Sequence, residues 1–351
     1  MELTKKDTKM IQGLSVLAMV CLHLFCRYDY QQLYQPLIFI KGLPLCFYFG
    51  QLSDFCVAGF AFCSGYSHAA MFENTDPKSY YKRRLKSLLS LYLNYWLIVC
   101  VFAVIGLITK NSTIPGSFTE FLLNFASLKN SYNGAWWYML VYAIIVFASP
   151  LLLTINKKLP RVPAFGLYLG LLVASLYFCY YAGIENPIVT RLLLYAVTVC
   201  EYMIGAASRK ARIFTCFGKI NNKLESKKSL KAVKYTVFLC AYLAMLLFHS
   251  LVSGSIALAS FLGYAIIVIF HYTKKPAFVE RFFLFIGKHS TNIWLTHMFF
   301  YTILFENFVF IAKYPLLIFI FMLAITVGIS VVLNKVLSFR KYLPVLKPAE
   351  A

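Results

Sequence analysis

Long, nearly uninterrupted runs of apolar residues recur along the chain, and short polar or charged segments separate them. Runs of this length predict helices that cross a bilayer, because a spanning helix needs about 20 predominantly apolar residues. Strands of a membrane barrel would instead show shorter segments in which apolar and polar residues alternate. The pattern therefore predicts ten spanning helices, at 11–26, 55–72, 88–108, 135–155, 163–183, 189–207, 234–251, 255–272, 291–311 and 315–336.

The composition excludes a soluble domain. Of the 351 residues, 60% are hydrophobic and only 13% are charged. We expect an all-α, polytopic bundle of transmembrane helices that forms one domain over 1–337, followed by a short cytoplasmic tail at 338–351. No small-residue cleavage site follows the first apolar run, so the first helix is expected to be retained rather than removed as a secretory signal.

Basic residues are distributed unevenly between the two sides of the predicted bundle. An even number of spans puts both termini on one side, and cytoplasmic loops carry the excess of Lys and Arg. With both termini in the cytoplasm, 28 of the 34 Lys and Arg residues lie on that side. The net charge of +21 therefore needs no nucleic-acid partner, since anionic lipids of the inner leaflet attract these residues. The basic residues on the outer side are Arg27, Lys41, Lys110, Lys129, Arg191 and Lys313.

The segments between the spans are short. The polar stretch 208–233 is expected to be a basic cytoplasmic loop, and 27–54 and 109–134 are the larger external loops. Within the first of these, an apolar piece at 37–50 is broken by Gly42 and Pro44, which predicts a re-entrant or interfacial segment. The 10 cysteines show no metal-ligand spacing, so neither a metal site nor disulfides are predicted.

Ionisable residues inside apolar runs are costly in a bilayer, which makes each a candidate for function. His23 lies toward the external half of the first predicted helix, and its imidazole could deprotonate a hydroxyl near neutral pH. A packed, hydrogen-bonded histidine explains the position equally well. Lys9 and Gln12 fall near the same helix face, with Lys9 about 21 Å from His23 along the axis. The other candidates are Asp54, His68, Glu201, His249, His271, His297 and Glu306.

Two groups on the predicted cytoplasmic side suit a thin ligand or a phosphorylated cofactor. Ser64 lies in a stretch of small residues that would let a thin ligand or another helix approach the backbone. Arg83 and Arg84 precede the third span, and arginine side chains bind phosphates in a bidentate manner. Plain helix packing and topology-setting charge are the alternative explanations.

A second aromatic and polar group lies near the outer side. Asn133, Trp137 and Tyr138 precede or begin the fourth span, where they form either a platform for a sugar or an ordinary aromatic belt. His297 follows the segment 286–290 along the ninth predicted span. Whether its imidazole faces the interior of the bundle depends on helix packing.

In type and in order along the chain, these residues and segments resemble the motifs of the acyltransferase 3 family. This family comprises bacterial multispan membrane acyltransferases, which modify cell-surface polysaccharides and related glycans. The set spreads over residues 9–297. The matching residues are His23, the segment Phe62-Cys63-Ser64-Gly65-Tyr66, Arg83-Arg84, Trp137-Tyr138 followed by Pro150, and Ile286-Gly287 followed by His297.

The resemblance implies transfer of an acyl group, usually acetyl, from cytoplasmic acyl-CoA to a hydroxyl of a glycan or glycolipid at the outer face. It implies that His23 is the catalytic base, that Arg83 and Arg84 bind the donor, and that Ser64 lies close to the acyl group. It further implies a bacterial plasma membrane and the company of glycan-assembly proteins. The acceptor side would involve Asn133, Trp137, Tyr138 and His297.

The sequence departs from the family at one position. Family members often carry an arginine ten intervening residues before the first-span histidine, where this chain has Gln12. Either Lys9, one turn below, supplies the positive charge for the donor, or the donor is bound in a different way.

Two other functional classes fit a chain of this composition. A glycan or lipid transporter, or a flippase, would also need buried ionisable residues, although no inverted repeat is visible. A non-enzymatic sensor or scaffold would tolerate substitution of His23 and Arg83.

Overall fold

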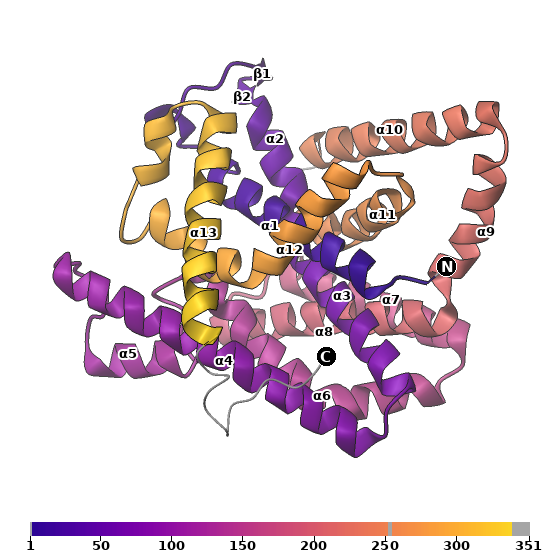
Figure 1. Ribbon diagram of the computed structural model, residues 1–351, viewed down its shortest axis with the longest axis horizontal. Coiled ribbons are helices and arrows are strands. Elements are labelled where there is room, and N and C mark those ends of the chain that lie inside the picture. The colour runs from indigo at the N-terminus through magenta and orange to yellow at the C-terminus, as the bar shows by residue number, and fades with distance from the viewer. Residues whose placement is uncertain (1, 252–254, 339–351) are drawn as a thin grey trace. The chain divides into compact units, whose positions relative to one another are not determined.

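The computed structural model describes residues 2–251 and 255–338, which are almost entirely helical (Figure 1). Contacts between backbones divide the described residues into two compact units. The first unit holds residues from 2–27, 38–74 and 151–288, and the second holds residues from 28–37, 75–150 and 289–338.

The first unit contains most of the helices. Its elements are α1 (Lys5–Phe25), β1 (Phe39–Ile40), β2 (Leu43–Pro44), α2 (Leu45–Leu52), a 3₁₀ turn (Ser53–Phe55), α3 (Cys56–Glu73), α7 (Arg161–Tyr180), α8 (Pro187–Ala211), α9 (Ile213–Glu225), α10 (Lys228–Leu251), a 3₁₀ turn (Ser255–Leu258) and α11 (Ala259–Tyr272).

The second unit is smaller, and two helices run from one unit into the other. It contains α4 (Pro77–Ile108), α5 (Phe118–Phe125), α13 (Pro315–Ser338) and the 3₁₀ turns Tyr30–Gln32, Gly134–Trp136, His297–Phe300 and Phe308–Ala312. The shared helices are α6 (Trp137–Lys158), which ends in the first unit, and α12 (Ala277–Thr296), which begins there.

Eight helical stretches in the described part are long and apolar enough to cross a membrane, which confirms a multi-pass helical membrane protein. Large apolar side chains point outward along these helices, as lipid-facing residues do, including Leu107 (63% exposed), Leu247 (61%) and Leu316 (70%). The stretches are α1, Leu45–Glu73, α4, Gly134–Lys158, α7, α8, Lys228–His249 and α13.

The prediction of ten spans is wrong at the two remaining places. The eighth predicted span, 255–272, is reduced to α11, whose 14 residues are shorter than a spanning helix needs. The ninth, 291–311, is not one helix: α12 begins at Ala277 and ends at Thr296, and 3₁₀ turns follow it. The apolar character of this run comes from aromatic rings that pack in irregular structure, as where Phe299 stacks on Phe102 with ring centroids 3.7 Å apart.

Two predicted loops contain regular structure. The stretch 208–233 is not a loop, because α9 occupies Ile213–Glu225 and buries Phe214 on one face of an amphipathic helix. The segment 37–50 holds a short antiparallel hairpin, in which Ile40 of β1 pairs with Leu43 of β2, followed by most of α2. Lys41 and Gly42 make the turn with φ angles of 48° and 81°, which a tight hairpin requires. The topology, with both termini cytoplasmic, and the single domain over 1–337 stay predictions, and residues 339–351 of the predicted tail lie outside the described part.

Helices α3 and α8 make a close backbone contact in the first unit (Figure 1). A Cβ added to Gly65 would lie 1.8 Å from the carbonyl oxygen of Tyr202, and one added to Gly205 would lie 2.2 Å from that of Phe62. Only glycine permits this approach, as in other membrane helix pairs with small residues at the interface. The contact brings the Nδ1 of His68 within 3.0 Å of the Tyr202 hydroxyl.

A buried ammonium group ties α9, α10 and α11 together. Lys234 is buried and donates hydrogen bonds to the Glu225 carboxylate, to Asn221 Oδ1 at 3.0 Å and to the Tyr272 carbonyl at 2.9 Å. Lys274 approaches the second oxygen of Glu225 at 3.0 Å. The hydrogen bonds from Lys234 and then Lys274 lower the pKa of Glu225 to about 2.

This ion pair predicts an acid-sensitive contribution to stability. Because the folded pKa of about 2 lies below the ordinary value of 4.5, the contribution is present above the ordinary value and is lost as the pH falls toward 2. Glu225→Gln should therefore unfold at a lower temperature than the wild type at neutral pH, and the difference should shrink on acidification. Thermal unfolding of both proteins in detergent across this pH range measures it. A difference that grows toward low pH would contradict the prediction.

Candidate functional site

Helix α1 is clamped in the first unit between α3 and the first half of α12. A Cβ added to Gly287 would lie 2.2 Å from the carbonyl oxygen of Lys9, and one added to Gly13 would lie 2.3 Å from that of Phe283. On the other side, a Cβ added to Gly59 would lie 2.1 Å from the Oγ of Ser15. Gly13 and Gly287 let α1 and α12 meet at backbone distance, and Gly59 lets the Ser15 side chain pack directly against α3.

These contacts of α1 bring together three segments that lie far apart in the sequence, namely the one around Lys9, 62–66 and 286–287. Cys63, beside the half-buried Ser64, lies with its Sγ 3.8 Å from the Thr8 carbonyl oxygen, next to Lys9. The segment 286–287 meets Lys9 from α12. The helix that carries His23 is therefore packed against both the 62–66 and the 286–287 segments.

His23 lies in the last turn of α1 and is half-buried. Helix α2 covers this end, since a Cβ on Gly50 would lie 2.8 Å from the backbone nitrogen of Cys26. Burial and, second, the neighbouring Asp54 carboxylate raise the pKa of the Cys26 thiol to about 11. Asp54 Oδ2 in turn lies 2.8 Å from Nε2 of His249. A carboxylate–imidazole pair is thus close to the turn that carries His23.

The structure gives most of the other ionisable candidates a polar partner. Glu201 accepts a hydrogen bond of 2.5 Å from the hydroxyl of Ser260. His271 Nδ1 lies 3.6 Å from a carboxylate oxygen of Asp7. Glu306 is exposed in the irregular segment after α12 rather than inside a helix. The pairing with Asp7 supports a structural role for His271, whereas the Oε2 of Glu201 is buried and has no hydrogen-bond partner among the described residues.

The second unit joins the predicted acceptor residues to the end of α12. Asn133 Nδ2 and Trp136 Nε1 both donate to the Leu295 carbonyl, at 3.1 and 3.0 Å. Trp294 Nε1 returns a hydrogen bond of 2.9 Å to the Ala135 carbonyl. The paired residues lie about 160 positions apart, so nothing in the sequence indicated this contact.

The four predicted acceptor residues differ in how far they are enclosed. Asn133 and His297 are buried, and His297 Nδ1 lies 2.9 Å from the Trp294 carbonyl. Trp137 and Tyr138 are half-buried, and the Tyr138 ring meets that of Trp294 edge-on at 5.7 Å. The structure therefore brings all four to one cluster around Trp294, with the aromatic pair as its more accessible part.

Arg83 and Arg84 lie in the second turn of α4. The helix begins where Asp76 accepts a hydrogen bond of 2.9 Å from the Ser79 backbone. The Ser79 hydroxyl and then this backbone contact lower the pKa of Asp76. Arg83 is exposed. The Nε of Arg84 is buried and has no hydrogen-bond partner among the described residues. Arg84 is also within electrostatic reach of Tyr142, whose ring stacks on that of Tyr138 at 6.2 Å.

A buried polar network in the second unit was missed by the sequence analysis. Asn94 Nδ2 donates to Asn292 Oδ1 at 2.6 Å, and Asn292 Nδ2 donates to the Ser330 hydroxyl at 3.0 Å. His289 Nδ1 lies 2.8 Å from the same hydroxyl. The signal in the sequence was Ser330 and Asn334, which are four residues apart on an otherwise apolar helix and so share one face.

Comparison with known proteins gives one match. The acyltransferase 3 family model, described as an acyltransferase domain, matches residues 9–335, which is most of the chain. Neither the curated proteins nor the solved structures contain a significant match. Because the match covers far more than half of its length, the chain belongs to the acyltransferase 3 family and is a multi-pass membrane acyltransferase.

Proposed function

We propose that this enzyme transfers an acetyl group from cytoplasmic acetyl-CoA to a hydroxyl of a cell-surface or exported glycan, in a bacterial plasma membrane. The observation that carries the proposal is the clamped α1, which holds the His23 helix against the 62–66 and 286–287 segments. A fixed base and a fixed approach for the donor lower the entropic cost of bringing two substrates together.

In the proposed reaction, the His23 imidazole accepts the proton of the acceptor hydroxyl as its oxygen attacks the thioester carbonyl. The carbon–sulfur bond then breaks, and the leaving thiolate of CoA takes the proton from the imidazolium. The products are the acetylated glycan and CoA with a free thiol. This sequence needs one base and no metal ion.

The donor and acceptor roles are assigned to the residues of the two units. Lys9 and Ser64 flank the path of the acyl arm in the first unit, and Arg83 and Arg84 bind phosphate groups of the donor. The support for Arg84 is its buried and unpaired Nε, since a guanidinium that lacks a protein partner suits an anionic ligand. Trp137 and Tyr138 would stack on the sugar, with Asn133 and His297 holding that cluster in place.

The direct test is acyl transfer by the purified protein in liposomes. The vesicles receive acetyl-CoA labelled in the acetyl group on the side of the termini, and a panel of glycans on the other side. We expect label on at least one glycan and release of free CoA thiol in equal amount. Movement of unlabelled glycan across the bilayer, with no transfer of label to any acceptor, would instead identify a transporter.

A further inference from the structure

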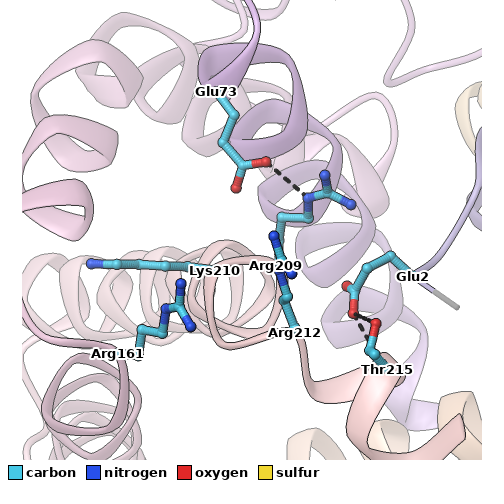
Figure 2. A pocket seen from close by; sticks show the side chains of 7 residues that line it. All are labelled: Glu2, Glu73, Arg161, Arg209, Lys210, Arg212 and Thr215. Carbon is cyan, nitrogen blue, oxygen red and sulfur yellow. Dashed lines mark hydrogen bonds and ion pairs between the residues drawn. The ribbon is translucent and has the colours of Figure 1, made fainter.

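A pocket of about 340 Å³ lies in the first unit, where α3 and α8 end and α7 and α9 begin (Figure 2). Its volume is close to the lower end of the range for small-molecule sites, about 300–1,000 Å³. In the sequence, the basic residues of this pocket had no sign of a role beyond setting the topology. The lining residues are Glu2, Glu73, Arg161, Arg209, Lys210, Arg212 and Thr215.

The pocket carries more positive than negative charge. Four cations face two carboxylates, and two of the cations are already engaged. Arg209 Nε lies 3.1 Å from Glu73, and Lys210 donates to backbone carbonyls at the end of α6, among them that of Lys157 at 3.2 Å. The side chains of Arg161 and Arg212 make no hydrogen bond or ion pair within the described residues, so these two guanidinium groups carry the positive charge that is not neutralised.

The pocket already binds one anionic group from its own chain. Glu2 Oε1 accepts hydrogen bonds from the Thr215 backbone at 2.9 Å and from the Thr215 hydroxyl at 2.7 Å (Figure 2). These donors belong to the first turn of α9, where the helix dipole favours a negative charge. The hydrogen-bond donors of Thr215 on this side of the pocket are therefore placed to bind the oxygen atoms of an anion.

Arg212 is held in a conformation that is unfavourable for it. It joins α8 to α9 with φ 54° and ψ 42°, the left-handed region that glycine adopts more readily. Strained residues of this kind persist where the surrounding structure or the function requires them. The strained turn presents the Arg212 side chain to the pocket, where Figure 2 places it between Arg161 and Glu2.

We propose that this pocket binds a phosphate ester through Arg161 and Arg212. Guanidinium groups pair with phosphate oxygens in a bidentate manner, and the two unpaired arginines supply the charge that a phosphate would neutralise. The phosphate would belong either to the nucleotide portion of the acyl donor or to a lipid headgroup. The first assignment rests on the proposed function, and the second is independent of it. In either case the site differs from the one assigned to Arg83 and Arg84.

Equilibrium binding to the purified full-length protein in neutral detergent tests the site. The probes are adenosine 3′,5′-bisphosphate for the nucleotide and phosphatidylglycerol for the lipid. Arg161→Gln/Arg212→Gln should weaken one of them by about tenfold or more. The matched control is Lys219→Gln/Lys223→Gln, which removes the same charge from exposed positions of α9. Arg212→Gly removes the side chain but tolerates the left-handed backbone, so it keeps the turn if the double variant fails to fold.

Each outcome is decisive. Loss of nucleotide binding in the pocket variants alone assigns the site to the donor, and loss of lipid binding alone assigns it to a headgroup. Equal affinities of wild type and pocket variants for both probes would overturn the proposal. Because binding is measured without acyl transfer, an enzyme that binds the nucleotide and fails to transfer label contradicts the proposed function and leaves this site intact.

Discussion

Replacing His23 by alanine is expected to lower kcat/KM for acyl transfer by about 10²–10⁴-fold, the contribution of a positioned general base. The imidazole lies in the last turn of a helix that close glycine contacts hold in place, so its removal should leave the fold intact. A neutral hydroxyl then has to attack the thioester without losing its proton to the enzyme. Initial rates with labelled acetyl-CoA in liposomes measure the loss.

The control for this substitution comes from the same turn. Cys21→Ala removes another half-buried side chain two residues earlier and should retain nearly all activity. The pH dependence gives a second readout, because the wild-type kcat/KM should fall on the acidic side as the imidazole becomes protonated. His23→Gln should lose this acidic limb together with the activity. Full activity in a folded His23→Ala protein would remove His23 from the mechanism.

The spans that the sequence predicted well are those in which apolar residues alone determine the structure. Helices α7 and α8 lie within a few residues of the predicted 163–183 and 189–207, since both are long, continuous apolar runs, of which α7 is the more exposed to lipid. The failures at 255–272 and 291–311 have a different cause. There, apolar and aromatic residues pack inside protein, where short helices and 3₁₀ turns are tolerated, and hydropathy does not distinguish the two environments.

The candidate site was predictable in its residue types but not in its contacts. Polar groups in apolar runs pointed to His23, yet nothing in the sequence showed that Gly287 would meet the backbone of Lys9, which is 278 positions away. The basic pocket could have been anticipated from local structure. Two successive antiparallel helices place the start of one beside the end of the next, which brings Arg161 close to Arg209 and Arg212.

Gly65→Ala is expected to destabilise the first unit by about 1–3 kcal/mol or more, the cost of overpacking a close contact. The added Cβ would lie 1.8 Å from the Tyr202 carbonyl oxygen, and backbone atoms cannot rotate away as a side chain can. The two helices would have to separate, which would also strain the hydrogen bond between His68 and Tyr202. Thermal unfolding in detergent measures the change. Gly166→Ala is the matched control, because no atom lies within 4 Å of its added Cβ.

Gly59→Ala tests a contact of another kind, because Gly59 of α3 meets a side chain of α1 and not its backbone. Its added Cβ would lie 2.1 Å from the Oγ of Ser15, and the nearest backbone is not involved. We therefore expect Ser15→Ala to restore much of the stability lost in Gly59→Ala, since it removes the colliding atom. No side-chain substitution on α8 can relieve Gly65→Ala in the same way, because Tyr202 contributes its carbonyl group whatever its side chain. If Gly65→Ala unfolded at the same temperature as Gly166→Ala, the backbone contact between α3 and α8 could not be as close as described.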